Sequence, residues 1–485
     1  MKFVSTRTGI PATAPESVFQ GLAPDGGLFL PLISGEASNL QSSILSVQTL
    51  GDAEKFVCDA LFGDFPEAVR KDAIDRLLSR FPAEDPIPLV EKDGLHILEL
   101  FLGKTGAFKD VALSMLPVFM RHAANGKRVL ILTATSGDTG SAAMQGFAGV
   151  DGTEIIVFYP ATGTSRIQKL QMTTPSEANV HAVGIRGNFD DAQAAVKRIF
   201  ASKEISEAAA KAGITLSSAN SINTGRLVPQ IAYYILAGAK LSATNCQQPT
   251  AFDVVVPSGN FGNILAAYYA KLLGSPIRRL VVASNVNDVL ARFVKTGVYD
   301  PGDRFTVTNS PSMDIRISSN VERLLWMLNY DGDVAAACAE VSRLMKDLKE
   351  KGRYELNEQA KAKLFADFVG GVATPEETEA EMRRMREAAD YLIDPHTAVA
   401  TFVAKKYQQG ELRSSTSTSH SNSSIPVVVA ATATPYKFPE TCLRAFGADV
   451  LTDPPPSFKD LEQLPIAQTR VCDVDKIDAE VTRLF

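Results

Sequence analysis

Short apolar runs recur along the chain from residue 129 onward, and each run ends in a turn that precedes a helical pattern. The runs are Val129–Leu132, Ile155–Phe158, Val180–Val183, Val254–Val256, Leu280–Ala283 and Val427–Ala430. Because they are short, rich in β-branched residues and apolar almost throughout, they predict strands buried on both faces of a sheet. Helical patterns alternate with them, for example at Phe189–Phe200, Asn263–Leu273 and Val334–Lys351. This alternation predicts an α/β fold with a mostly parallel sheet flanked by helices.

The first ninety residues have a different texture. They carry helical patterns at Ala53–Phe62 and Pro66–Arg80, and a Gly/Pro-rich entry at Gly21–Pro31. We expect residues 1–90 to form a small, mainly helical cap domain and residues 91–485 to form the main domain, with two α/β subdomains. Residues 413–424 are a Ser/Thr-rich stretch without apolar side chains, which predicts a surface insertion.

Composition narrows the functional classes. The chain has 485 residues, 45% of them hydrophobic and 21% charged, as in ordinary globular proteins. A net charge of −6 argues against nucleic-acid or anionic-membrane partners, but it leaves room for a small phosphorylated substrate. No run approaches the ~20 apolar residues of a membrane span, and the amino terminus lacks a secretory pattern. We therefore expect a soluble, cytoplasmic protein.

Cysteine and histidine give no sign of a metal site. The five cysteines are scattered without zinc-knuckle spacing, and they read as small buried hydrophobes of a reducing compartment. The five histidines form no HExxH pattern, so neither a structural nor a catalytic metal is expected.

Two strand-to-helix turns share one design. Residues 129–140 run from a strand into a Ser/Gly/Thr-rich turn, and residues 253–263 repeat the arrangement with the turn Pro-Ser-Gly-Asn-Phe-Gly-Asn. Small residues allow the backbone to approach an anion, and a helix start supplies free N–H groups. Each turn alone is weak evidence, because a plain tight turn is the more common explanation of such a sequence in an α/β fold. Together they suggest two phosphates, one on a cofactor and one on a substrate, and neither matches a nucleotide-binding motif.

A lysine stands at the start of a helical pattern. Residues 103–110 read Gly-Lys-Thr-Gly-Ala-Phe-Lys-Asp, and this segment with Lys109 lies directly ahead of the helical pattern Val111–His122. This position is unfavourable for a cation with respect to the helix dipole. A solvated lysine is the ordinary interpretation. A buried lysine beside a carbonyl cofactor is the alternative, because burial would favour a neutral, nucleophilic amine.

These motifs resemble those of threonine synthases, pyridoxal-phosphate-dependent enzymes with the tryptophan-synthase-β-like fold (fold type II). The similarity covers nearly the whole chain in the same order, and it points to the bacterial and fungal branch. Its segments are Gly21–Phe29, Thr105–Asp110, Ala134–Gly140, Ser218–Asn223, Pro257–Gly262, Ser284–Asp288, Ser312–Arg316, Asn320–Leu324 and Asp394–Ala400.

The resemblance implies roles for individual residues. Lys109 would bond to the cofactor, pyridoxal 5′-phosphate, and act as the catalytic residue. The cofactor phosphate would lie against Gly259, Asn260, Phe261, Gly262 and Asn263, and the pyridine nitrogen against the hydroxyl of Thr432. Substrate contacts are implied, more loosely, for Thr105, Ser136, Gly137, Asp138, Thr139, Asn220, Arg226, Asp314 and Arg316.

The implied reaction converts O-phosphohomoserine and water to L-threonine and phosphate. One departure bears on it: the family usually has Thr-Ala-His-Pro where this chain has Thr432-Ala433-Thr434-Pro435. A relative with the same site that releases 2-oxobutyrate, ammonia and phosphate is therefore the nearest alternative. A non-catalytic binding protein is a second alternative, which the retained Lys109 argues against. A nucleotide-dependent enzyme is a third alternative, but this chain lacks the phosphate-loop motif of such enzymes.

His396 fits either a site residue or a hydrogen-bonded histidine at a helix start. A monomer and a homodimer are equally compatible with the sequence.

Overall fold

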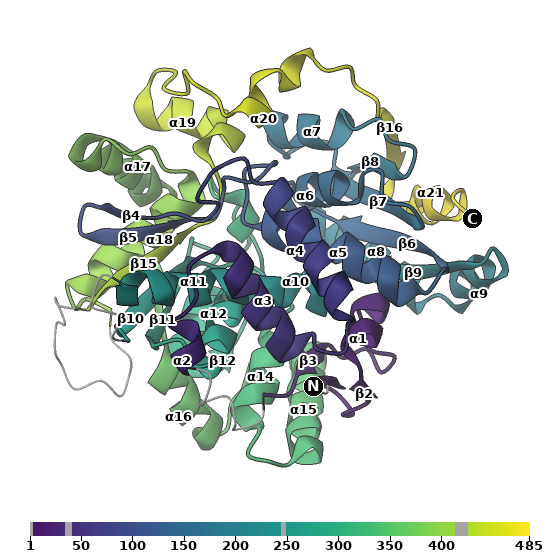
Figure 1. The fold of residues 1–485 in the computed structure, drawn as a ribbon, viewed down its shortest axis with the longest axis horizontal. Helices are drawn as coiled ribbons and strands as arrows, with labels where there is room; N and C mark the ends of the chain where they lie inside the picture. The colour runs from purple at the N-terminus through teal and green to yellow at the C-terminus, as the bar shows by residue number, and fades with distance from the viewer. Residues whose placement is uncertain (1–2, 34–40, 244–248, 413–424) are drawn as a thin grey trace.

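The computed structural model describes residues 3–33, 41–243, 249–412 and 425–485. Two largely parallel sheets lie in different halves of the molecule, and helices cover both (Figure 1). The first sheet has the order β14 (Phe368–Val372), β11 (Ile277–Ser284), β10 (Phe252–Pro257), β15 (Val427–Ala431), β5 (Leu95–Glu99) and β4 (Leu89–Lys92). The second has the order β16 (Arg470–Asp473), β8 (Val180–Arg186), β7 (Thr153–Pro160), β6 (Arg128–Ala134) and β9 (Ile214–Ser218). Only the edge strand β4 pairs antiparallel in these two sheets. The predicted α/β class is confirmed.

All six apolar runs form strands, namely β6, β7, β8, β10, β11 and β15. In the first sheet Val254 lies opposite Leu280 on one side and Val428 on the other, and all three side chains are fully buried. A central strand with helices on both faces has no solvent-facing side. This explains why these runs are apolar without alternation.

The three helices predicted as examples are also present, as α8 (Phe189–Ala201), α12 (Gly262–Leu272) and α15 (Val334–Lys351). The other helices of the main body are α5 (Lys109–Ala124), α6 (Asp138–Phe147), α7 (Arg166–Thr173), α9 (Lys203–Lys211), α10 (Thr224–Leu227), α11 (Pro229–Ala243), α13 (Val289–Thr296), α14 (Val321–Asn329), α16 (Glu358–Asp367), α17 (Pro375–Ala389), α18 (Pro395–Gln408), α19 (Pro439–Phe446), α20 (Pro456–Lys459) and α21 (Ile477–Thr482). Short 3₁₀ turns include η2 (Pro311–Met313) and η3 (Pro435–Lys437).

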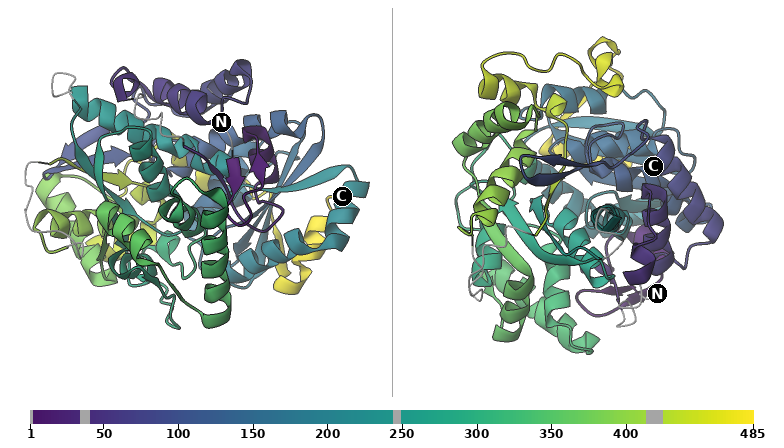
Figure 2. Two further views of the ribbon diagram at one scale, coloured as in Figure 1. Left: turned by 90° about the horizontal axis from the view of Figure 1, so that it is seen from below. Right: turned by 60° about the vertical axis from the view of Figure 1, so that its left-hand side comes forward.

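The N-terminal part contains the two predicted helices, α3 (Leu50–Leu61) and α4 (Glu67–Ser79), on one outer side of the molecule (Figure 2). The helices α1 (Ala14–Gln20) and α2 (Gln41–Ile44) are added to them. This part also contains an antiparallel sheet with the order β2 (Pro11–Ala12), β1 (Phe3–Ser5) and β3 (Phe29–Pro31), which the sequence pattern did not predict. These elements share a core with the main body, where the Phe62 ring lies 5.1 Å from that of Phe119 of α5.

The expected boundary at residue 90 falls inside β4, and the predicted insertion at 413–424 lies outside the described residues. Within the described ranges, every helix is too short or too polar to cross a membrane. No group of three or more potential metal ligands occurs there either. The described cysteines, Cys58, Cys338, Cys442 and Cys472, are buried and free.

Candidate active site

A cavity of about 660 Å³ opens at the carboxyl ends of strands from both sheets. It is bordered by Ala134, the last residue of β6, and by Pro257, the last residue of β10. Thr432 follows β15 and lines the same space. The carboxyl ends of parallel strands are where ligands bind in α/β proteins. The two turns that the sequence singled out therefore face a common cavity.

Lys109 is the first residue of α5, and its side chain is 13% exposed within this cavity. Its Nζ lies 3.2 Å from Oδ2 of Asp138. Burial lowers the pKa of Lys109, and the nearby cations Arg226 and Lys437 lower it further, whereas Asp138 opposes them. Lys109 is thus biased toward the neutral amine that a nucleophile or a base requires.

The loop that carries Lys109 is held by the segment that follows β15. Phe108 N donates to the Thr432 carbonyl at 2.9 Å, and Thr434 N donates to the Gly106 carbonyl at 3.0 Å. Gly106 has a φ of +70°, and a Cβ there would lie 2.7 Å from Phe458 Cζ. The close approach and the left-handed backbone both require glycine, and they fix the entry of α5.

Asp138, in the first turn of α6, is a convergence point. Its Oδ2 accepts from Lys109 and, at 3.2 Å, from Ser312 Oγ, while its Oδ1 lies 2.7 Å from Gln168 Nε2 and 3.0 Å from Lys437 Nζ. Burial alone would raise the pKa of Asp138, but the two lysines hold it well below its usual range. The arrangement therefore favours a carboxylate beside the Lys109 amine.

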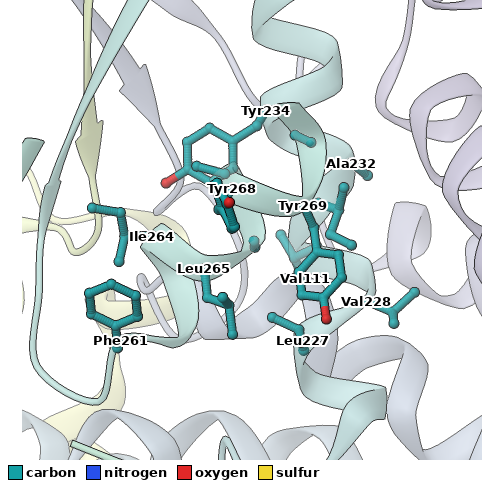
Figure 3. Packing of buried hydrophobic residues seen from close by; sticks show 14 of the residues in the cluster. Val111, Leu227, Val228, Ala232, Tyr234, Phe261, Ile264, Leu265, Tyr268 and Tyr269 are labelled. Carbon is teal, nitrogen blue, oxygen red and sulfur yellow. The ribbon is translucent and has the colours of Figure 1, made fainter. Parts of the chain in front are cut away.

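The turn after β10 forms a cradle of backbone N–H groups at the start of α12. Phe261 has a left-handed φ of +63°, and a Cβ on Gly259 would lie 2.7 Å from the Ser312 carbonyl oxygen. Phe261 and Ile264 anchor the turn in the buried cluster that also contains Tyr234 (Figure 3). Asn263 Nδ2 is buried and has no hydrogen-bond partner among the described residues. A helix start with an unused buried donor suits an anion.

Arg226, on the short helix α10, is a buried cation on the wall of the cavity. Its Nη1 donates to the Ala219 carbonyl at 2.7 Å, and its Nε has no partner among the residues that the structure describes. Burial lowers its pKa to about 10. In the described part of the chain no carboxylate forms an ion pair with it. A buried guanidinium without a counter-charge indicates an anionic ligand.

The comparisons agree with this geometry. The family described as pyridoxal-phosphate dependent enzyme matches residues 82–420, and the threonine synthase C-terminal family matches residues 397–483. Threonine synthase from Saccharomyces cerevisiae is 34% identical, over 99% of this chain and 96% of its own. The enzyme of that name from Pseudomonas aeruginosa is 37% identical, over 92% and 90%. The crystal structure of PLP-bound threonine synthase from Brucella melitensis superposes with a TM-score of 0.84 at 35% identity, covering 100% of this chain and 99% of that one.

The chain belongs to the threonine synthase family.

This family of pyridoxal-phosphate enzymes has fold type II, as expected. The match to the pyridoxal-phosphate dependent enzyme family begins at residue 82, shortly before β4. The unused Asn263 and Arg226 donors and the helix start at Gly262 fit an anionic group such as the cofactor phosphate. Thr432 adds a hydroxyl to the wall of the same cavity. The residues present fit the cofactor.

Most of the site residues expected in a threonine synthase line the cavity. These are Lys109, Ser136, Asp138, Thr139, Asn220, Arg226, Gly259, Asn260, Phe261, Gly262, Asn263, Asp314 and Thr432. Asp314 also organises its own loop, because its carboxylate accepts from Asn285, Asn287 and Thr308.

Three expected substrate residues do not line the cavity. Thr105 is fully buried within the loop that carries Lys109, and its hydroxyl donates to Asp110 at 2.7 Å. Gly137 donates its N–H to Thr135 Oγ1, and an added Cβ there would overlap the Gln168 side chain. Arg316 donates to the Gly302 carbonyl in a separate surface hollow. Direct substrate contact by these residues has no support in the geometry.

Sequence reasoning assigned no role to Gln168, Ser312 and Lys437, and it left His396 open between a site residue and a hydrogen-bonded histidine at a helix start. Ser312 N donates to His396 Nε2 at 3.1 Å, and His396 Nδ1 lies 2.6 Å from Asp394 Oδ2, so His396 links helix α18 to the cavity wall. Ser312, His396 and Lys437 stand in or beside the family motifs and could have been found from them. Gln168 carries no such signal.

Proposed function

We propose that this chain converts O-phosphohomoserine and water to L-threonine and phosphate. The observation that carries the proposal is the position of Lys109, whose Nζ lies 3.2 Å from Asp138 in the cavity that also contains the anion cradle at Gly259–Asn263. Lys109 would hold the cofactor aldehyde carbon, the cradle would hold its phosphate, and Thr432 would meet its pyridine nitrogen. When bound, pyridoxal phosphate withdraws electrons from the carbon skeleton of an amino acid.

The protein must supply a group that transfers protons and a site that binds the anionic groups of the substrate. Lys109, biased toward the neutral amine, takes the proton from the substrate α-carbon and returns protons later in the cycle. Asp138 stays charged throughout and orients the Lys109 nitrogen. Arg226, with Ser136, Thr139 and Asn220 nearby on the cavity wall, offers donors to the anionic groups of the substrate. The neutral hydroxyl of Thr432 would leave the pyridine ring less strongly protonated than a carboxylate would.

Thr434 bears on the choice between threonine and 2-oxobutyrate as the product. Its side chain is 3% exposed and does not line the cavity. Instead, its Cγ2 packs toward Gly106, where a Cβ would lie 2.5 Å away. The residue that replaces the family histidine therefore sits behind the Lys109 loop, and this supports retention of the synthase reaction.

The test is a product assay of the purified enzyme with O-phosphohomoserine. We expect threonine and phosphate in equal amounts from the wild type, and loss of nearly all turnover in Lys109→Ala. Oxobutyrate as the main product would overturn the synthase assignment, and wild-type turnover in Lys109→Ala would overturn the role of the lysine.

The remaining expectations belong to the same proposal. We infer a cap domain over residues 1–90, a catalytic domain over 91–485, a cytoplasmic location and a monomeric or homodimeric state. Four buried, free cysteines support a reducing compartment. Light scattering of the purified protein would distinguish the two oligomeric states.

A further inference from the structure

Lys437 is a fully buried lysine with an unusual set of partners. It ends the 3₁₀ turn η3, and its side chain is 0% exposed. Its Nζ lies 3.0 Å from Asp138 Oδ1 and donates to the Thr105 carbonyl at 2.9 Å. Its own carbonyl accepts from Ser165 Oγ at 2.8 Å, which ties it to the start of α7. The ammonium group is therefore held by two oxygens, and the Ser165 contact fixes the backbone that carries it.

Asp138 is shared between two lysines, one on each carboxylate oxygen. Lys109 contacts Oδ2 from the cavity side, while Lys437 contacts Oδ1 from the buried side. If Lys109 were the only cation, loss of its proton would leave a buried carboxylate without a counter-charge, which is strongly unfavourable. Such a one-to-one pair would hold Lys109 as an ammonium. A second cation removes this obstacle.

We propose that Lys437 is a positioning residue that holds Asp138 as a carboxylate, so that Lys109 can release its proton while the buried ion pair stays intact. The inference rests on the proposed role of Lys109. In the step, the Lys109 N–H bond breaks, its electron pair remains on the amine, and the proton leaves to water at the cavity mouth. The water forms a new O–H bond with this proton, and no other bond changes. The Asp138 charge is balanced by Lys437 before and after.

Two of the charges around Lys109 also favour loss of its proton. Arg226 of α10 and Lys437 both disfavour a proton on Lys109, and Asp138 alone favours it. His396 of α18 faces Asp138, and Asp110 of α5 faces Lys437 through the Thr105 loop. Asp314 faces His396. With Lys437 removed, Lys109 would be the only ammonium partner of Asp138 within the described ranges.

The test follows cofactor uptake by the full-length protein stripped of pyridoxal phosphate. Its rate is measured against pH from the absorbance of the bound cofactor, and borohydride trapping locates the label on the Lys109 peptide. In Lys437→Met we expect the pH of half-maximal rate to rise by about one unit, which makes uptake about tenfold slower at a fixed pH below the midpoint. An unchanged midpoint would overturn the proposal.

Two matched variants separate charge from shape. Lys437→Arg keeps a buried cation and should stay close to the wild-type midpoint, whereas a midpoint as high as that of Lys437→Met would contradict the charge argument. Lys459→Met removes an exposed lysine of α20 and should change nothing. A shift equal to that of Lys437→Met in this control would show that net charge, not the contact with Asp138, sets the midpoint.

A double variant covers the case in which Lys437→Met fails to fold. Asp138→Asn/Lys437→Met removes the carboxylate together with its buried partner, so Lys109 loses the group that favours its protonation. Its midpoint should lie at or below that of the wild type, and a raised midpoint would refute the proposal. The readout needs no substrate, so it is independent of which product the enzyme makes. A label that persists in Lys109→Ala would instead count against the proposed function.

Discussion

The hydroxyl of Tyr234 on α11 donates a 2.6 Å hydrogen bond to Oδ1 of Asn263 in the first turn of α12. The neighbouring Tyr233 hydroxyl donates to the same oxygen at 2.8 Å. Both tyrosines are fully buried, and Tyr234 lies beside α12 in the cluster of Figure 3. With its oxygen engaged twice, the amide of Asn263 keeps Nδ2 as a buried donor without a partner among the described residues, in a residue that lines the cavity.

This arrangement predicts that the tyrosine pair supports cofactor affinity from outside the cavity. Tyr234→Phe should weaken binding of pyridoxal phosphate about fivefold, since one buried hydrogen bond contributes about 1 kcal/mol. The double change Tyr233→Phe/Tyr234→Phe should weaken it more, because nothing then orients the amide. Equilibrium dialysis of the stripped protein measures the dissociation constant.

Tyr269 of α12 supplies the matched control, because it is equally buried but its hydroxyl has no partner among the described residues (Figure 3). Tyr269→Phe should leave cofactor affinity unchanged. Equal losses in Tyr234→Phe and Tyr269→Phe would show that the tyrosines act through general packing alone.

Gly106 gives a second prediction, on the entry to α5. A Cβ at this position would lie 2.5 Å from Thr434 Cγ2 and 2.7 Å from Phe458 Cζ, on a backbone with φ +70°. Gly106→Ala should lower the free energy of unfolding by about 3 kcal/mol, the sum of left-handed strain and overpacking. It should also displace Lys109 and reduce turnover.

Gly126→Ala is the control, because φ is +83° but no atom lies within 4 Å of the added Cβ. It should lower the free energy of unfolding by only about 1 kcal/mol, from backbone strain alone, and leave turnover intact. Urea unfolding compares the two variants. Equal losses of unfolding free energy in the two variants would show that Gly106 is not tightly packed against Thr434 and Phe458.

The buried strands and the turns after them could be predicted because both depend on local sequence. The runs that became β6 and β10 are apolar throughout, since both faces of the sheet are covered. Strand β5 was missed because His96 and Glu99 interrupt its apolar pattern, and β9 because Thr215, Ser217 and Ser218 do the same. The N-terminal strands are three residues long or shorter, too short to produce a period.

The convergence on Asp138 could not be predicted from local patterns. Gln168 comes from the helix after β7, and Lys437 comes from a turn almost 300 positions away along the chain, so their contact depends on how the two sheets meet. Family motifs identified the cavity-lining positions but not their orientation. Thr105 lies in such a motif, yet its hydroxyl turns to Asp110 behind the cavity.

Two buried arginines predict opposite effects of the same substitution. Arg323 of α14 is fully buried and donates to the carbonyls of Phe29, Ser221 and Ile222 and to Asn320 Oδ1. Arg226 has one such bond and an unused Nε. Arg323→Met should lower the free energy of unfolding by more than about 3 kcal/mol, because several carbonyls lose a charged donor.

Arg226→Met should leave the stability of the cofactor-free protein unchanged or raise it, since it removes a buried charge without a counter-charge. It should at the same time weaken the binding of an anionic ligand, measured as the KM for O-phosphohomoserine and the dissociation constant for pyridoxal phosphate. A variant as unstable as Arg323→Met, with both constants unchanged, would assign Arg226 a structural role.

Glu54 of α3 predicts a pH dependence of stability. Its carboxyl is fully buried, and both oxygens lack hydrogen-bond partners among the described residues. Burial raises its pKa well above the usual 4.5, so the folded protein keeps the proton at pH values where the unfolded chain has lost it. The unfolded state is then favoured progressively as pH rises, and full stability is present only at pH values below about 4.5.

Replacing Glu54 with its neutral isostere removes this linkage. Above a pH of about 4.5, the free energy of unfolding of Glu54→Gln should exceed that of the wild type by about 1.4 kcal/mol for each further pH unit. The difference should stop growing once the wild-type carboxyl ionises in the folded state. Urea unfolding of both proteins between pH 4 and pH 8 measures the difference, with Glu350→Gln on the exposed face of α15 as the control. Because the control carboxyl is solvated in both states, its curve should run parallel to that of the wild type. If the Glu54→Gln curve does the same, the buried carboxyl must be ionised and paired in the folded protein.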